Sequence, residues 1–342
     1  MFNNTVQRIG FCCKYMHPDQ NQPKRVLEEL QRPFNTRGTT VQWLNRQSRS
    51  DAEQRLWEIL QHNIQSARQL VQYVSTLPQG QRMVRLGSDL LPMYTEPTWG
   101  YFWRQPDVIR YCETEFATVG ELARQRDVRL SFHPGQFCVL ASATDDIVSR
   151  SVEEFEYHVD MARWMGYGAQ FQDFKINVHI SGRRGAQGII DVLGRLTPEA
   201  RNMLTIENDE MCWGLDESLK LTDHCALVLD IHHHLIREAE YIQPNDSRVA
   251  SVIDSWRGVR PALHYSYSRC EHLPEDAHDS APSITQLIAQ GHKKQKLRAH
   301  SDRYPNSTVN QWALSFWPQF DIQCEAKHKN LASTELFLSA TQ

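Results

Sequence analysis

Six short segments of this chain each combine an apolar run with a carboxylate or an imidazole at its end. The segments are RLSFHPGQF, KINVHISG, MLTIENDE, ALVLDIHHH, PALHYS and FDIQCEAK, and the polar residues that follow the apolar runs are His133, His179, Glu207, Asp230, His264 and Glu325. Apolar runs of this length are typical of strands in a buried parallel sheet. A barrel of parallel strands gathers the carboxyl ends of its strands at one mouth, so the pattern predicts such a barrel with a polar site there.

The spacing of these positions bears on whether the chain forms one barrel or two smaller domains, both of which a length of 342 residues allows. Each interval is long enough for a helical crossover of about a dozen residues, and helix-like segments lie at 51–74, 106–127 and 145–165. The longest interval, between His264 and Glu325, contains a loop-like stretch at 274–281 and a helix-like stretch at 307–317. We therefore expect a single TIM (β/α)8 barrel domain over residues 1–342, with an N-terminal extension and an insertion between strands seven and eight.

Composition narrows the class of protein. The 37 basic and 41 acidic side chains leave a net charge of -4, so no global basic field indicates a nucleic-acid partner, although local basic clusters lie at 183–184 and 293–298. None of the eight cysteines has C-x-x-C spacing, and no apolar run approaches the roughly 18 residues of a membrane span. We expect a cytoplasmic protein in a reducing compartment, without a membrane partner.

The converging polar residues favour a metal site. A single histidine at a strand end is more often a hydrogen-bonded core residue, but several carboxylates at one mouth repel each other unless a cation compensates them. Histidine with carboxylate suits manganese, zinc or iron better than calcium. If two metals lie about 3.5 to 4 Å apart, Glu207 is a candidate bridging ligand, and phosphoester hydrolysis is a common use of that geometry. From the triplet His232, His233 and His234 we expect one ligand.

The motifs RLGSDLLPM, HPGQF, NVHISG, IENDE, VLDIHH, RAHSD and CEAK, in this order and at this spacing, resemble those of the ultraviolet damage endonucleases. The segment TVQWLNRQSRSDAEQRLWEILQHNI also resembles the first crossover of that family, so the resemblance covers the chain from about residue 8 to residue 327. It implies one barrel of the apurinic endonuclease and xylose isomerase superfamily. It also implies metal-assisted cleavage of damaged double-stranded DNA on the 5′ side of pyrimidine dimers, with abasic sites as a further expected substrate.

Carried over residue by residue, the resemblance implies a set of metal ligands at one site: His133, His179, Glu207, Asp230, His233, His264, His300 and Glu325. Glu207 would hold and bridge metals, His233 or His300 would lie near the scissile phosphate, and Lys327 would contact phosphate. Gln136 and Phe137 would probe the lesion by inserting into the duplex, with Phe11 near them. We expect two or three divalent ions, manganese first and zinc or iron as alternatives, in a monomeric enzyme.

The chain departs from the family at three positions. Many members carry a lysine two residues before the seventh-strand histidine, where a modified lysine can help to hold metals, and this chain has Ala262 there. The difference implies a weaker or missing third metal. Phe11 stands where many members have a tyrosine, and Tyr15 where they have an asparagine.

A second function class follows from the same ligand pattern. A metal-dependent barrel of this kind can instead act on a small molecule, as sugar isomerases do, or modify a nucleotide or peptide by di-iron oxidative chemistry. Ala262, Phe11 and the acidic net charge leave this alternative open. The effect of salt concentration on affinity distinguishes a DNA-cutting enzyme from a small-molecule enzyme. Contacts with DNA phosphates release counterions, so affinity for DNA falls steeply as salt rises.

Overall fold

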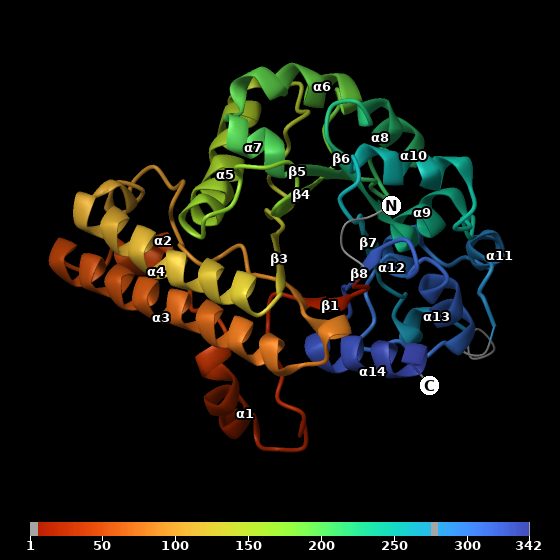
Figure 1. Ribbon diagram of the computed structural model, residues 1–342, viewed down its shortest axis with the longest axis horizontal. Helices are drawn as coiled ribbons and strands as arrows, with labels where there is room; N and C mark the ends of the chain where they lie inside the picture. The colour runs from red at the N-terminus through yellow and green to blue at the C-terminus, as the bar shows by residue number, and fades with distance from the viewer. Residues whose placement is uncertain (1–5, 275–279, 342) are drawn as a thin grey trace.

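Eight parallel strands form a closed barrel in chain order (Figure 1). The computed structural model describes residues 6–274 and 280–341. The strands are β1 Ile9–Cys12, β2 Met83–Arg85, β3 Arg129–Phe132, β4 Lys175–His179, β5 Leu204–Glu207, β6 Ala226–Asp230, β7 Ala262–Tyr265 and β8 Asp321–Cys324. Strand β1 pairs with both β2 and β8, which closes the barrel. The predicted TIM barrel is confirmed.

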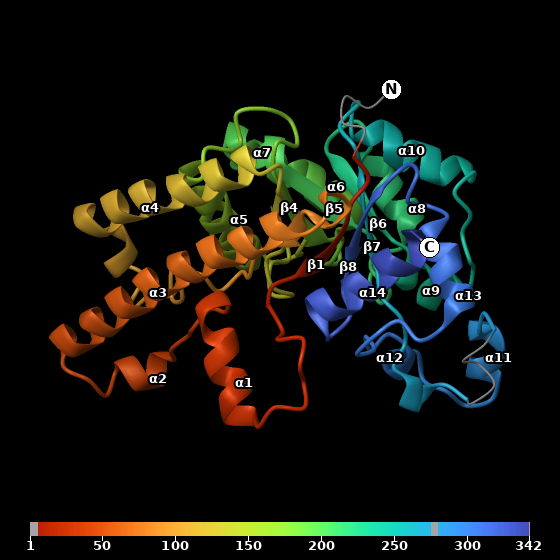
Figure 2. The ribbon, with the colours of Figure 1, turned by 60° about the horizontal axis from the view of Figure 1, so that its bottom comes forward.

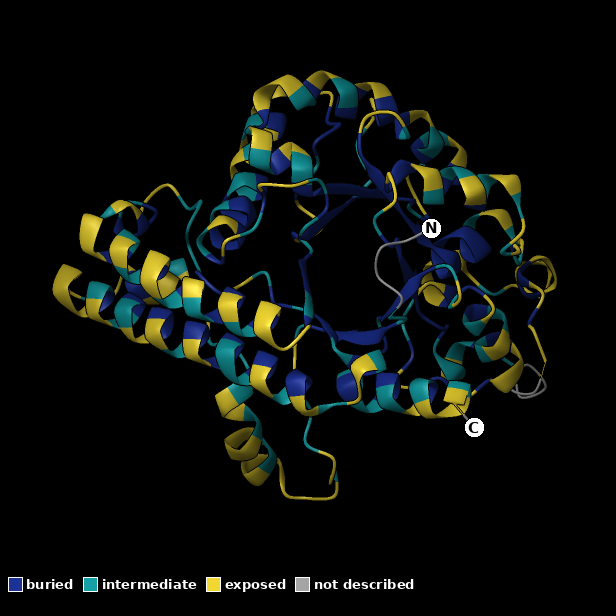
Figure 3. Ribbon diagram, in the orientation of Figure 1, coloured by how far each residue is buried: buried dark blue, intermediate teal, exposed yellow. Residues whose placement is uncertain are grey.

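The strands are short apolar runs because both of their faces are buried. Their side chains are almost all buried, and the helices cover the outer face of the sheet while keeping their own outer sides exposed (Figure 3). Side chains alternate between the interior and the exterior of a barrel, so Ala226, Val228 and Asp230 of β6 face the same side. Ala226 and Val228 pack with Ala262 and Trp256 in a small apolar cluster. The apolar part of the barrel interior is confined to this side, because Thr205 of β5 and Asp321 of β8 are paired in register with Ala226 and Ala262.

The helices have the bounds α1 Lys24–Gln31, α2 Val41–Leu44, α3 Arg49–Thr76, α4 Pro106–Gln125, α5 Asp145–Trp164, α6 Gly185–Val192, α7 Pro198–Met203, α8 Leu215–Ser218, α9 Ile231–Glu238, α10 Ser247–Ser255, α11 Ile284–Ala289, α12 Lys294–Leu297, α13 Ser307–Leu314 and α14 Lys329–Thr341. Helix α3 begins after Ser48, whose hydroxyl accepts a hydrogen bond from the Asp51 amide. It packs against α4 through one apolar stripe. Within the described ranges, no helix is both long and apolar enough to cross a membrane.

Two additions project beyond the end of the barrel at which the strands end (Figure 2). One is the connection between β1 and α3, which contains α1, a helix with no buried residue. Because it follows the first strand, it is an insertion after β1 and not the expected N-terminal extension. The other is the insertion between β7 and β8, which contains α11 and α12 and lies where the sequence predicts it. Its expected loop at 274–281 falls largely on residues 275–279, which are outside the described residues. The helix expected at 307–317 is α13 and ends at Leu314.

Candidate metal centre

The strand ends place the predicted ligands at one mouth of the barrel. His133 follows β3 directly, His179 ends β4, Glu207 ends β5, Asp230 ends β6, His264 lies in β7 and Glu325 follows β8. The parallel register sets His179 beside Glu207 and Asp230 beside His264. Six positions far apart in the sequence are thus brought together by strand pairing alone.

Glu207 lies at the centre of this group and is fully buried. Its Oε1 is 3.0 Å from Nδ1 of His264 and 3.5 Å from Nδ1 of His233. Its Oε2 is 3.3 Å from Nε2 of His133 and 3.7 Å from Nε2 of His179. Each carboxylate oxygen therefore faces two imidazoles, which is the arrangement that a bridging carboxylate between two metals requires.

The side chains form four overlapping groups whose ligand atoms lie within 4.8 Å of one another. The groups are His133, His179 and Glu207; His179, Glu210 and His233; Glu207, Asp230 and His233; and Asp230, His264 and Glu325. Seven of the eight predicted ligands belong to these groups. His300 belongs to none of them among the described residues; its Nδ1 lies 3.1 Å from the backbone oxygen of Glu325 and 3.9 Å from Oε2 of that residue.

The start of α9 explains which member of the histidine triplet faces the group. Asp230 caps this helix, because its Oδ1 accepts a hydrogen bond of 2.7 Å from the His233 amide. This cap holds His233 over the mouth, where its Nε2 is 3.5 Å from Oε2 of Glu210. His234 instead contacts Glu240 through Nε2 at 3.0 Å, and His232 is buried with its ring 6.3 Å from the ring of His300.

Burial and charge at this mouth fit a cation. Oδ2 of Asp230 is buried and has no hydrogen-bond partner. Burial raises the pKa of Asp230 well above its ordinary value, and the carboxylates of Glu207 and Glu325 raise it further. An uncompensated buried carboxylate costs several kcal/mol, and a divalent ion removes that cost. The residues present therefore fit a site for divalent metal.

The pKa values of two imidazoles, those of His179 and His233, are raised by the same excess of negative charge. Burial opposes the charging of His233, but the carboxylates of Asp230, Glu207 and Glu210 raise its pKa to about 10. Burial likewise opposes the ionisation of Glu207, but His264 and His179 hold the pKa of Glu207 well below its ordinary value. The pKa of His179 is raised as well, whereas burial lowers the pKa values of His133, His264 and His300. Without a metal ion, protons on His179 and His233 therefore compensate the carboxylates, and bound metal would replace those protons.

The predicted lesion-probing residues lie in different environments. Phe137, on the loop after His133, exposes 84% of its side chain, and Gln136 beside it is also exposed. Phe11 is 1% exposed within the hydrophobic core, unlike Phe137, and its expected place near the lesion stays a prediction. The side chain of Lys327 is exposed two residues after Glu325.

Comparison with known proteins gives the family. The sequence matches the family described as UV-endonuclease UvdE over residues 8–341, which is nearly the whole chain. The chain belongs to this family. The match agrees with the order of strand-end motifs from HPGQF to CEAK.

Two relatives of this UvdE protein show how far the likeness extends. It is 28% identical to a UV DNA damage endonuclease of Bacillus velezensis over 66% of this chain and 69% of the relative. It is 27% identical to a UV-damage endonuclease of Schizosaccharomyces pombe over 94% of this chain and 54% of the relative, so it spans about half of that protein.

Solved structures extend the comparison to the fold. The crystal structure of SacUVDE covers 98% of both chains with a TM-score of 0.71 at 17% identity. Endonuclease IV from Thermus thermophilus covers 80% of this chain and 93% of that chain with a TM-score of 0.50 at 14% identity. At these identities the likeness shows the shared barrel fold.

Lys175 bears on the expectation of a weaker or missing third metal, which came from Ala262 in the place of the family lysine. Lys175 begins β4, is 4% exposed, and has its Nζ 2.7 Å from Nε2 of His264. Burial, together with the charge of Arg85, lowers the pKa of Lys175 to about 7. The small side chain of Ala262, two residues before His264, is also buried. A lysine amine therefore does contact the seventh-strand histidine, but it comes from a different strand.

Sequence reasoning missed three further residues of the mouth. Glu210 belongs to a ligand group, and Asp209 accepts a hydrogen bond from Nδ1 of His179 at 3.1 Å. Both lie in the IENDE motif, where three acidic residues after one strand were the available signal. Arg85 at the end of β2 pairs with Glu325. Contacts of this kind orient ligands and raise their basicity.

Proposed function

We propose that this UvdE protein is a metal-dependent DNA repair endonuclease that nicks the backbone on the 5′ side of pyrimidine dimers and other UV photoproducts, with abasic sites as further substrates. The observation that carries the proposal is the family match over residues 8–341 together with the buried His and carboxylate groups at the barrel mouth. Active sites of TIM barrels lie at this carboxyl mouth.

The ligand groups support a centre of two or three ions. Glu207 takes part in two of the groups and Asp230 in two, so each carboxylate can serve neighbouring ions. Divalent metal bound there would polarise the phosphodiester and lower the pKa of water for in-line attack. Manganese is the metal that we propose, with zinc or iron as alternatives, because imidazole and carboxylate ligands suit all three.

The chain's own residues would then position the substrate. Glu207 and Glu325 would hold the ions, and the partly exposed His300 would lie beside the scissile phosphate with His233. Lys327 is exposed at the same mouth and would contact a phosphate oxygen. These are the catalytic roles that we propose for Glu207, His233, His300 and Lys327.

The exposed ring of Phe137 supports recognition of a distorted duplex. An apolar side chain that wedges between base steps costs a few kcal/mol in lost stacking, and the cost is least where the bases are already damaged. Phe137 exposes 84% of its side chain beside the exposed Gln136. We propose that this pair probes the duplex for weak stacking and thereby reads damage instead of sequence.

The insertion between β7 and β8 supports contact with the DNA backbone. Lys293, Lys294 and Lys296 of this insertion are exposed, and Arg298 donates a hydrogen bond of 2.6 Å to Glu210 at the mouth. The insertion projects beyond the metal end of the barrel (Figure 2). A local basic surface can thus contact phosphates although the net charge of the whole chain is -4.

The proposal is tested by metal content and nicking in a Glu207→Gln variant. Loss of one carboxylate charge from the shared ligand should reduce bound metal, measured by elemental analysis, and lower nicking of damaged DNA by at least about 100-fold. The matched control is Glu240→Gln, because Glu240 contacts His234 and lies in none of the ligand groups. A folded Glu207→Gln protein with full metal content and full nicking would contradict the assignment.

A further inference from the structure

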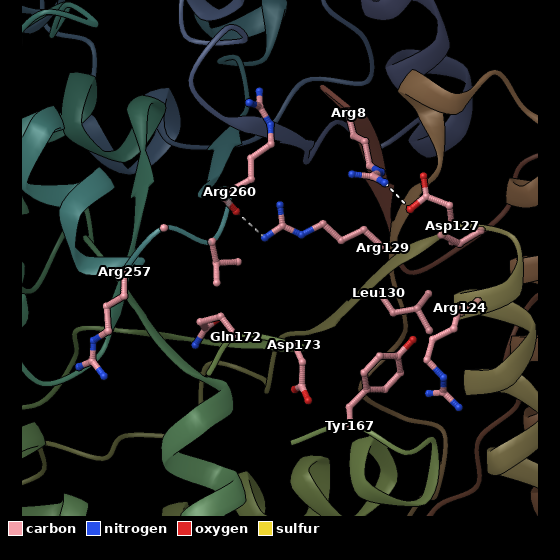
Figure 4. A pocket seen from close by; sticks show the side chains of 14 residues that line it. Arg8, Arg124, Asp127, Arg129, Leu130, Tyr167, Gln172, Asp173, Arg257 and Arg260 are labelled. Atoms are coloured by element: carbon pink, nitrogen blue, oxygen red, sulfur yellow. Dashed lines mark hydrogen bonds and ion pairs between the residues drawn. The ribbon is translucent and has the colours of Figure 1, made fainter. Parts of the chain in front are cut away.

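The amino end of the barrel, opposite the metal-type ligands, holds a cavity of about 610 Å³. Arg8 lies just before β1, Arg129 begins β3 and Arg260 lies just before β7, so the strand entrances supply much of its wall. Figure 4 shows Arg129 extending across the cavity toward Arg260, with Arg257 and Arg124 on opposite sides. A cavity of this volume lies within the range of small-molecule sites.

The lining of this cavity carries more positive than negative charge. Its lining includes five arginines and two aspartates, namely Arg8, Arg124, Arg129, Arg257, Arg260, Asp127 and Asp173. A third aspartate, the buried Asp321, accepts hydrogen bonds from Arg129 at 2.7 Å and from Arg260 at 2.8 Å. Even with Asp321 counted, the arginines outnumber the aspartates, and the concave wall focuses the resulting field.

Two buried polar atoms of residues in the same wall have no hydrogen-bond partner among the residues that the structure describes. They are Nε of Arg8 and Oε1 of Gln172, and their residues are 2% and 6% exposed. Burial lowers the pKa of Arg8 from its ordinary value, and Arg129 and Arg260 also lower it, against the opposing effect of Asp321 and Asp127. Neither atom is accessible to solvent, so the accessible donors of the cavity are those of the exposed Arg124 and Arg257.

Three residues that line the cavity have an unusual backbone conformation. Asp127, Gln172 and Arg257 line the cavity in the left-handed region, with φ of 54°, 54° and 52°. This conformation costs a residue with a side chain roughly 1 kcal/mol or more and is the position where glycine is usual. Asp127 and Arg257 directly follow the C-caps of α4 and α10, where a left-handed residue commonly ends a helix, so this conformation shapes the turns that form the cavity rim.

We propose that this amino-end cavity binds a small phosphomonoester, that is, a nucleotide or a sugar phosphate. The arginines supply charge-assisted donors for the phosphate oxygens, and guanidinium groups match that geometry. The site is separate from the metal centre, and it does not depend on the cleavage chemistry proposed above.

The test is isothermal titration calorimetry on the full-length protein with its metals, using deoxythymidine monophosphate, ribose 5-phosphate and inorganic phosphate as probes. The key variant is the double change Arg124→Gln with Arg257→Gln, because both residues are exposed at the rim and neither takes part in the Asp321 ion pairs. We expect saturable binding of a phosphomonoester that weakens at least tenfold in this variant. The tighter of the two esters identifies the source of the phosphate.

The control removes the same charge elsewhere, through Arg110→Gln with Arg195→Gln, both exposed and outside the cavity lining. This control should bind as the unchanged protein does. Absence of saturable binding, or equal weakening by the control, would overturn the proposal and leave the arginines with a structural role. Binding that instead disappears only with Lys327→Gln would place the phosphate at the metal end and would also overturn it.

Discussion

Phe137 is the residue for which sequence and structure give the most specific prediction about the recognition of damaged DNA. Its ring is the most exposed of the large apolar side chains in the described ranges, at 84%. Replacement by alanine removes the wedge but no packing, so stability should change by less than about 0.5 kcal/mol. We predict that Phe137→Ala lowers nicking of a dimer-containing duplex at least about tenfold, with a smaller loss at an abasic site, where less stacking must be broken.

The control for that prediction is Leu338→Ala on α14, which also removes an exposed apolar side chain, 50% exposed, but lies away from the β3 loop. The measurement is kcat/KM on the two duplexes. Equal loss on both substrates, or loss in the Leu338→Ala protein as well, would argue against a wedge.

Lys175 carries the clearest dependence on pH at the residue scale. Its pKa in the folded chain is about 7 against an ordinary value of 10.5, so the unfolded chain binds more protons between these two pH values. Stability of the metal-free protein should therefore rise with pH across this window, by up to about 1.4 kcal/mol per pH unit from this residue. Above pH 10.5 the buried Lys175 is neutral in both states and does not lower stability. As pH falls toward 7, Lys175 gains a proton in the unfolded chain but not in the folded chain, so the folded state loses stability.

We predict that Lys175→Met removes this dependence and makes the chelated protein more stable than the unchanged protein near pH 7. The measurement is denaturant unfolding of both proteins between pH 7 and pH 10, and the difference in unfolding free energy should shrink as pH rises. A difference that stays constant with pH would show that Lys175 is charged in the folded chain.

At the scale of elements, the insertion between β7 and β8 makes a prediction about affinity. Each lysine that neutralises a phosphate contributes about 0.9 to the slope of log affinity against log salt. The double change Lys293→Gln with Lys296→Gln should thus reduce the magnitude of that slope by up to about 1.8. The control is Arg110→Gln with Arg126→Gln, two exposed residues near the opposite ends of α4. Slopes that fall equally in both proteins would remove the insertion from the DNA-binding surface.

The sequence predicted the strands and helices better than it predicted contacts between individual side chains. The strand ends at His133, His179 and Glu207 were predictable, because an apolar run followed by a metal-binding residue type indicates the carboxyl end of a strand in a parallel barrel. Helix α3 was predictable from its apolar stripe and begins two residues before the predicted start at residue 51. The contact between Lys175 and His264 was not predictable, because it joins β4 and β7, which are not neighbours in the sheet.

At the scale of the whole molecule, the barrel divides its polar groups between two mouths. The carboxyl mouth gathers buried carboxylates and imidazoles, and the amino mouth gathers arginines around Asp321. Ala226, Val228, Ala262 and Trp256 form one small apolar cluster on one side of the barrel. Sequence reasoning found the first mouth from strand ends, but it missed the second because Arg8, Arg129 and Arg260 precede strands, where polar residues are common.

The central claim is metal-dependent cleavage beside a UV lesion, and one assay tests it directly. A duplex carrying one cyclobutane pyrimidine dimer is incubated with the full-length protein and manganese, beside an undamaged duplex and a sample with chelator. The account predicts a nick immediately 5′ of the dimer that is absent from the undamaged duplex and abolished by chelator. No nick from protein shown to hold its metals, or a nick that persists in chelator, would contradict it.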